Sequence, residues 1–145
     1  MKKIVLVDID GTIAKVGDRL KYLKAKKPDY DAFYASCFDD APIQEIIDLV
    51  KILSERYKIV YCTGRREQVR AQTTAWFFKH DLPTGKLIMR PNNDKRHDVE
   101  VKPEQLQKIG IDLNNIAFVL EDRNSMVKKW RSLGVKCLQV DYGEF

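Results

Sequence analysis

The chain has 145 residues, of which 44% are hydrophobic and 32% are charged, and its formal net charge is +5. This length and balance predict one compact domain over residues 1–145 and exclude a disordered or fibrous chain. No apolar run approaches the roughly 20 residues that cross a bilayer, so we expect no membrane partner. The positive charge suggests an anionic partner only if the cations cluster in space.

Three cysteines, Cys37, Cys62 and Cys137, are odd in number and widely spaced. They form no C-x-x-C pair, so neither a disulfide framework nor a cysteine-rich zinc site is expected. Reduced thiols are typical of the cytosol, and we therefore expect a cytoplasmic protein. Residues 1–8 are basic and then apolar, but they end in an acid, which favours a buried strand over a signal peptide.

Five short β-rich runs alternate with helical patterns along the chain. The runs cover residues 4–8, 58–62, 86–90, 116–120 and 136–140. Their nearly continuous apolar character is typical of parallel strands that are covered on both faces. The alternation predicts an α/β fold: an open, Rossmann-like, five-stranded parallel sheet with helices on both faces. We expect the strand order 3-2-1-4-5.

Four amphipathic patterns lie between the strands, over residues 43–53, 69–77, 103–109 and 126–133. Their apolar residues recur at helical spacing, and Gly110 and Gly134 are predicted to end the last two helices. Trp76, Phe77 and Trp130 fall on these apolar faces, so we expect them in the core rather than in a stacking role.

Residues 13–39 are the one irregular segment. They are too few for a second domain, so we expect a flap or small cap that follows the first strand and covers the site. The segment carries lysines and then aromatic residues: Lys21, Lys24, Lys26, Lys27, Tyr30, Phe33, Tyr34 and Phe38. Two interpretations of the lysines stay open, a solvated surface, which is common for lysine, and a contact with an anionic ligand.

Polar side chains follow three predicted strands at their carboxyl ends, where ligands bind in open α/β sheets. The segments are Asp8-Ile9-Asp10-Gly11-Thr12, Thr63-Gly64-Arg65 and Glu121-Asp122-Arg123. Four carboxylates in a small volume repel one another unless a cation neutralises them. Because an all-oxygen ligand set favours a hard ion, we expect magnesium. A calcium-binding loop of the Asp-x-Asp-Gly type is disfavoured, since it needs flanking helices and further ligands along its length.

Cations are expected at the same edge of the sheet, from Arg65, Arg123 and Lys102. Lys102 precedes Pro103, which is predicted to begin a helix, so its charge would lie at the positive end of a helix dipole. That placement costs roughly 0.3–1 kcal/mol when no anion is near. A metal among carboxylates, flanked by cations and helix N-termini, is typical of a phosphate site.

These residues resemble a known family. Asp8-x-Asp10-Gly11-Thr12, Thr63, Lys102 and Glu121-Asp122 are similar, in order, to the four motifs of the haloacid-dehalogenase-like (HAD) phosphatases. Within that superfamily the chain resembles the 3′-phosphatase domain of bacteriophage polynucleotide kinase. The further matching positions are Arg19, Thr63-Gly64-Arg65, Arg90, Asp94, Arg96, Asp98, Lys102 and Glu121-Asp122-Arg123. The interval from Arg90 to Lys102 is the most specific part, because superfamily membership alone does not require it.

The sequence departs from that domain in three ways. No G-x-x-x-x-G-K-[ST] phosphate loop occurs, so no kinase half is expected. The helix after Thr63-Gly64-Arg65 is shorter than in the family. Thr63 and Glu121 are conservative exchanges that keep the hydroxyl and the carboxylate.

The resemblance implies a magnesium-dependent phosphomonoesterase that works through an aspartyl-phosphate. Asp8 would be the nucleophile and Asp10, which has left the strand, the general acid and base. Magnesium would be held by Asp8, by the main-chain carbonyl of Asp10 and by Asp122. Thr63 and Lys102 would contact the phosphoryl group.

The remaining site residues are expected around these. Asp98 and Glu121 would be partners that fix Lys102 and metal-bound water. The candidates to hold phosphates of the substrate are Arg19, Arg65, Arg96 and Arg123.

The substrate that the resemblance implies is a 3′-phosphate at a DNA or RNA end, as in nucleic-acid repair. A small-molecule 5′- or 3′-nucleotidase uses the same chemistry and stays an open alternative, as a nucleotide would fit the same site. A non-catalytic module that grips phosphorylated ends is disfavoured, because Asp8, Asp10 and Asp122 are all present. A phospho-acceptor signalling domain fits poorly, since Asp10 would act as the acid and base that hydrolyses its aspartyl-phosphate.

Overall fold

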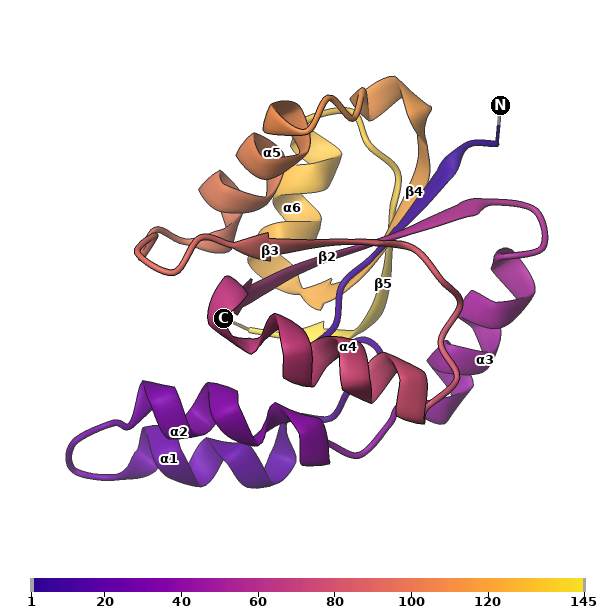
Figure 1. The fold of residues 1–145 in the computed structure, drawn as a ribbon. Coiled ribbons are helices and arrows are strands. Elements are labelled where there is room, and N and C mark those ends of the chain that lie inside the picture. The colour runs from indigo at the N-terminus through magenta and orange to yellow at the C-terminus, as the bar shows by residue number, and fades with distance from the viewer. Residues whose placement is uncertain (1, 145) are drawn as a thin grey trace.

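The computed structural model describes residues 2–144, which form an α/β fold (Figure 1). Within this range lies a five-stranded parallel sheet of order β3-β2-β1-β4-β5. The strands are β1 (Ile4–Val7), β2 (Lys58–Arg66), β3 (Lys86–Arg90), β4 (Ile116–Arg123) and β5 (Cys137–Gly143). The predicted fold class and strand order are confirmed.

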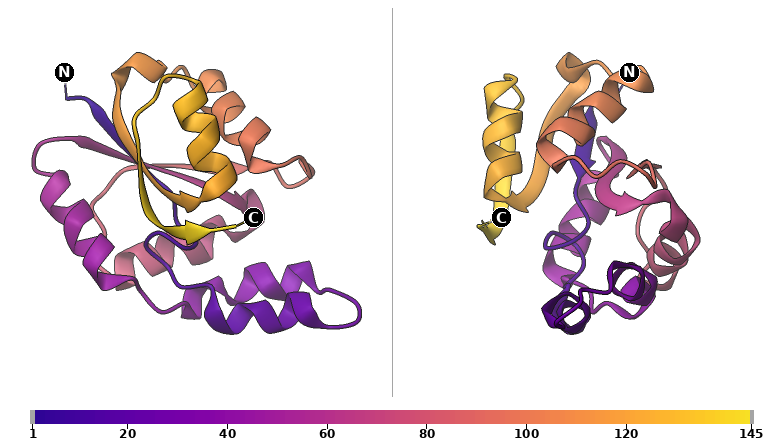
Figure 2. Two further views of the ribbon diagram at one scale, coloured as in Figure 1. Left: turned by 180° about the vertical axis from the view of Figure 1, so that it is seen from behind. Right: turned by 90° about the vertical axis from the view of Figure 1, so that its left-hand side faces the viewer.

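Helices cover both faces of the sheet (Figures 1 and 2). They are α3 (Gln44–Leu53) and α4 (Arg70–Lys79) on one face, and α5 (Asp98–Lys108) and α6 (Asn124–Ser132) on the other. Successive residues of β1 point to opposite faces, so Leu6 joins the core cluster beneath α5 and α6, and Val7 joins the one beneath α3 and α4. Because both faces are buried, every position of β1 is apolar.

One tryptophan lies in each of these two core clusters, Trp76 from α4 and Trp130 from α6, and both are fully buried. Phe77 packs, partly buried, against the same cluster as Trp76. Their predicted place in the core is confirmed. The indole nitrogen of Trp76 also donates to the main-chain carbonyl of Asp40 at 2.9 Å. This bond ties α4 to the segment that leads into α3.

Three strands run beyond the ends that the apolar pattern predicts: β2 reaches Arg66, β4 reaches Arg123 and β5 reaches Gly143. Main-chain pairing resumes past the apolar run after a register shift, so that Arg66 lies opposite Arg90 and Arg123 opposite Gly143. These extensions matter for function, because they carry arginine and carboxylate side chains out to the carboxyl edge of the sheet.

Helix α5 begins at Asp98, not near Pro103, and its N-cap is His97, whose ring nitrogen Nδ1 accepts from the main-chain N–H of Val99. The prediction that Lys102 precedes this helix is therefore wrong. Lys102 lies in the second turn, and Pro103 is inside the helix. The Pro103 ring removes the main-chain donor that would bond the carbonyl one turn earlier, yet the helix continues to Lys108.

Residues 13–39 contain two short helices, α1 (Leu20–Lys24) and α2 (Tyr30–Ala35). The 3₁₀ turns η1 (Gly17–Arg19) and η2 (Ser36–Asp39) flank them. Elsewhere in the chain, the turn η3 (Glu67–Val69) precedes α4, and the turn η4 (Leu113–Asn115) precedes β4. Figures 1 and 2 show α1 and α2 side by side, projecting beyond the body of the sheet. Among the described residues, no helix is both long and apolar enough to cross a membrane.

Candidate active site

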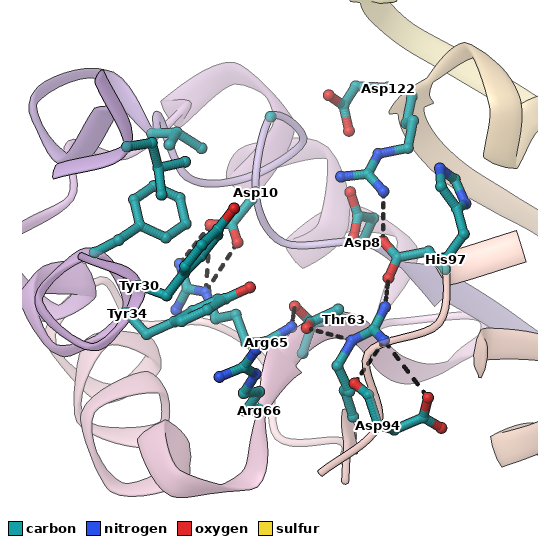
Figure 3. Close-up of a pocket in the computed structure, with 18 of the residues that line it drawn as sticks. Asp8, Asp10, Tyr30, Tyr34, Thr63, Arg65, Arg66, Asp94, His97 and Asp122 are labelled. Carbon is teal, nitrogen blue, oxygen red and sulfur yellow. Dashed lines mark hydrogen bonds and ion pairs between the residues drawn. The ribbon is translucent and has the colours of Figure 1, made fainter. Parts of the chain in front are cut away.

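A cavity of about 1120 Å³ opens at the carboxyl edge of the sheet, where the α1–α2 pair overhangs β1, β2 and β4 (Figure 3). Asp8 and Asp10 after β1, Thr63 in β2 and Asp122 in β4 all line it. The three segments that the sequence singled out as strand ends therefore meet in one pocket.

Three buried acidic residues, Asp8, Glu121 and Asp122, can direct ligand atoms within 4.8 Å of one another. Burial, and then the negative charge of Asp8, raise the pKa of Asp122 to about 7. Thr12 donates to the group weakly, with its Oγ1 3.4 Å from Asp8 and 3.3 Å from Asp122. A divalent cation would relieve the repulsion between these carboxylates, and their all-oxygen donor set fits magnesium.

Gly11 lets the chain pass close to this acidic group. Its φ is +83°, and a Cβ there would lie 2.0 Å from Asp122 Oδ2. Both the left-handed backbone and the close approach exclude a larger residue. The loop after β1 can therefore lie directly against Asp122.

Lys102 places a cation beside the predicted nucleophile. Its Nζ donates to Asp8 Oδ1 at 2.8 Å and to Glu121 Oε2 at 3.0 Å, and the side chain is buried. Burial alone would lower the pKa of Lys102, but the charges of Asp8 and Glu121 raise it well above its usual value. The ammonium group is therefore charged and held at Asp8, where it can neutralise an incoming phosphoryl group.

Two arginines hold the Asp10 carboxylate. Arg19 Nη2 lies 2.8 Å and Arg65 Nη2 2.7 Å from its Oδ1, and each arginine also bonds Asp40, at 2.7 Å and 3.0 Å. Burial alone would raise the pKa of Asp10, but the charges of Arg65 and Arg19 lower it below its usual value. The Asp10 side chain thus lies with cations, apart from the Asp8, Glu121 and Asp122 group.

This arrangement differs from the predicted role of Arg19 and Arg65 as ligands for substrate phosphates. Their exposed fractions are 2% and 1%, and both guanidinium groups are already paired with aspartates. Asp40, which lies 30 positions from Asp10 in the sequence, is not among the predicted site residues. Nothing in the sequence spacing indicates that Asp40 meets the two arginines.

Asp98 is bonded by arginines rather than by Lys102. Arg90 donates to its Oδ1, and Arg123 Nη1 donates to its Oδ2 at 2.9 Å. The carboxylate lies against Gly64, where a Cβ would be 2.6 Å from Oδ1. Of the two predicted partners of Lys102, Glu121 is placed to fix it, and Asp98 instead fixes Arg123 at the pocket.

Arg96 and Thr63 complete the predicted set. Arg96 lines the pocket at its rim, 46% exposed, with Nη2 2.7 Å from both Asp94 and Glu104. Thr63 is buried in the pocket wall, and its Oγ1 accepts the main-chain N–H of Arg65 at 3.1 Å. That bond leaves the hydroxyl proton of Thr63 available for another acceptor, such as a phosphoryl oxygen.

Comparison with known proteins assigns the family. Residues 2–145 match the family model of the polynucleotide kinase PNKP phosphatase domain. The chain belongs to this family. The resemblance seen in the sequence motifs is confirmed, and the chain is a phosphatase domain of the HAD-like superfamily.

Relatives of this phosphatase domain are larger proteins. A protein of Autographa californica nuclear polyhedrosis virus, described as a bifunctional polynucleotide kinase/RNA ligase, is 30% identical over 136 residues. That alignment covers 92% of this chain and 18% of the viral protein.

Solved structures agree with this assignment. A Pnkp1/Rnl/Hen1 complex contains a chain that is 30% identical with a TM-score of 0.82, and a Pnkp1/Rnl/Hen1 RNA repair complex contains one that is 28% identical with a TM-score of 0.85. Both cover 100% of the phosphatase domain, which spans 48% and 44% of those chains. A HAD-like hydrolase of Streptococcus pneumoniae, 15% identical with a TM-score of 0.67, covers 99% of this chain and 87% of its own and shares the fold alone.

Magnesium should stabilise the phosphatase domain through Asp8 and Asp122. At a concentration of 100 times Kd, a bound ion adds about 2.7 kcal/mol to the free energy of unfolding, which corresponds to a rise in Tm on the order of 5–10 °C. Thermal melting with magnesium and with EDTA measures the shift. Asp122→Asn should lose most of the shift yet be at least as stable in EDTA, because one repelling carboxylate is gone. An undiminished shift in Asp122→Asn would place the ion elsewhere.

Proposed function

We propose that this domain is a magnesium-dependent phosphomonoesterase that removes 3′-phosphates from nucleic-acid ends through an aspartyl-phosphate on Asp8. The observation that carries the proposal is the setting of Asp8, whose carboxylate is 2.8 Å from the Lys102 ammonium and within metal-ligand reach of Asp122 in one pocket. The viral polynucleotide kinase/RNA ligase and the RNA repair complex among its relatives support a nucleic-acid end as the substrate.

In the first step, a carboxylate oxygen of Asp8 forms a bond to phosphorus while the bond from phosphorus to the 3′ oxygen breaks. Asp10 gives its proton to that oxygen, so the strand leaves with a 3′-hydroxyl. The acid role needs a protonated Asp10. The negative charge of an incoming phosphate favours protonation, because a nearby like charge raises the pKa of a carboxyl group.

In the second step, water attacks phosphorus, Asp10 takes the proton of the water, and the bond from phosphorus to Asp8 breaks to release phosphate. Arg19 and Arg65 act as positioning residues here. Their ion pairs with Asp10 hold its carboxylate in place and keep it ionised, which is the form that accepts a proton.

Magnesium would be held by Asp8, the main-chain carbonyl of Asp10 and Asp122, and it supplies positive charge against the phosphoryl oxygens. Lys102 adds a second positive charge at Asp8, and Thr63 donates a hydrogen bond to a phosphoryl oxygen. Arg123, which Asp98 fixes, and Arg96 at the rim both line the pocket and would meet phosphates of the strand.

A substrate panel tests the proposal. One oligonucleotide is supplied with a 3′-phosphate or a 5′-phosphate, alongside a nucleoside 3′-monophosphate, each with magnesium or with EDTA. We expect kcat/KM for the oligonucleotide 3′-phosphate to exceed the other two by about tenfold or more. EDTA should abolish phosphate release from all three. Equal rates for the oligonucleotide and the mononucleotide would favour the nucleotidase, and turnover that persists in EDTA would contradict the metal requirement.

A further inference from the structure

Arg66 is a pocket-lining arginine with no acidic partner. Among residues 2–144, no carboxylate lies within 4.0 Å of its guanidinium nitrogens, so it forms no ion pair there. Its buried Nε has no hydrogen-bond partner. By contrast, Arg65 is paired with Asp10, Arg90 with Asp98 and Arg96 with Asp94. Because no described carboxylate neutralises the guanidinium, its terminal N–H groups are available to an anionic ligand in the pocket.

The Arg66 guanidinium is held in position by an aromatic ring rather than by a charge. It lies 5.4 Å from the ring centroid of Tyr34, which packs against a small core cluster that includes Val69 and Met89. The backbone of Arg66 is fixed as well, since it pairs with Arg90 across β2 and β3. Arg66 is therefore placed before a ligand arrives, and its cation–π contact with Tyr34 uses none of its N–H groups.

Tyr30 adds an open aromatic face beside this group. It lies four positions before Tyr34 on α2, so both side chains project from one side of the helix, and both line the pocket. Tyr30 is 53% exposed. Figure 3 shows Tyr30, Tyr34 and Arg66 on one side of the pocket, with Asp8, Asp122 and His97 on the other.

We infer that Arg66, Tyr34 and Tyr30 form a second subsite, for the nucleotide that precedes the 3′-phosphorylated end of a single strand. Arg66 donates hydrogen bonds to the internucleotide phosphate, and Tyr30 stacks on a base. An unpaired guanidinium next to an aromatic ring is the combination that binds single strands without reading sequence. The cavity of about 1120 Å³ exceeds the upper range of roughly 1,000 Å³ for small-ligand sites, so it has room for more than a phosphoryl group.

This inference rests on the proposed function and deepens it, because it selects an oligonucleotide over a mononucleotide. Its test measures binding in an Asp8→Asn background, where turnover is not needed. A fluorescent oligonucleotide 3′-phosphate is titrated by anisotropy, and a nucleoside 3′-monophosphate is measured as a competitor. The variants are Arg66→Gln, Arg66→Lys and Tyr30→Ala. Arg56→Gln is the matched control, since Arg56 is exposed and does not line the pocket.

Arg66→Gln should weaken oligonucleotide binding by about 10- to 100-fold, and at least tenfold more than it weakens mononucleotide binding. The salt dependence of log K should become shallower by about 0.7, the contribution of one phosphate on a single strand. Arg66→Lys should recover the salt dependence but only part of the affinity. Tyr30→Ala should weaken the oligonucleotide alone, and Arg56→Gln should change neither ligand.

Equal losses for both ligands in a folded Arg66→Gln protein would overturn the second subsite, since Arg66 would then act at the scissile phosphate or on the fold. Unchanged oligonucleotide binding would overturn it too, as would a parent protein that binds both ligands equally. Failure of the proposed function looks different, because it shows as no phosphate release by the unsubstituted protein from any member of the panel.

Discussion

Asp8→Asn is expected to lower phosphate release from every monoester by about 10³-fold or more, because a neutral amide oxygen is a far weaker nucleophile than the proposed carboxylate oxygen. The fold should be retained. Asp8 is 8% exposed and repels Asp122, so losing its charge removes a repulsion as well as the ion pair with Lys102. Steady-state phosphate release and thermal melting in EDTA measure the two effects separately.

Asp48→Asn is the control for this variant. Asp48 is exposed on α3, outside the pocket, and its Oδ1 accepts from Gln44 at 2.8 Å. The same chemical change there should leave both turnover and Tm nearly unchanged. If Asp8→Asn hydrolysed substrate at the rate of the unsubstituted protein, the covalent mechanism would have to be abandoned.

Lys102→Met should lose both activity and stability. The change leaves Asp8 and Glu121 buried without their shared cation, and breaking a buried pair in this way costs about 3–5 kcal/mol. Turnover should fall by about 10²-fold or more, because a charge beside the phosphoryl group is removed. Urea unfolding in EDTA measures the stability, since magnesium would mask part of the loss.

A double variant separates the two losses. Glu121→Gln in the Lys102→Met background removes one of the two orphaned charges, so part of the free energy of unfolding should return while turnover does not. Recovery of turnover in the double variant, or full activity in Lys102→Met alone, would show that Lys102 acts only on the fold.

The sheet could be predicted from sequence because its strands are buried on both faces. The four consecutive apolar residues of β1 can be recognised from composition alone, and the alternation with helical patterns gives the topology. The polar ends of β2 and β4 could not be predicted, since Arg66 and Arg123 continue their strands through main-chain pairing and not through burial of apolar side chains. The start of α5 was also predicted wrongly. Proline is common at helix starts, but Pro103 lies inside α5, which begins at Asp98.

The acidic group of the site followed from motif order, but its ion pairs did not. Asp8 and Asp122 had to lie at one edge once the sheet was recognised. Whether Arg65 meets a substrate phosphate or Asp10 depends on side-chain packing between segments that are far apart in sequence. Asp40 and Arg66 show this limit most clearly. Asp40 matters because it pairs with two arginines, and Arg66 matters because no described carboxylate pairs with it, and neither fact can be predicted from sequence spacing.

Arg19 has a consequence for how the α1–α2 pair can vary. It bonds Asp10 where the chain leaves the sheet and Asp40 where the chain returns, and main-chain bridges join Ala14 to Asp10 and to Pro42. The root of the helical pair is thus fixed to Asp10, the proposed acid and base, while its tip at residues 25–29 takes no part in these bonds. Insertions at the tip would lengthen the reach of the overhang and alter which polymer ends are admitted, without displacing the reacting carboxylates.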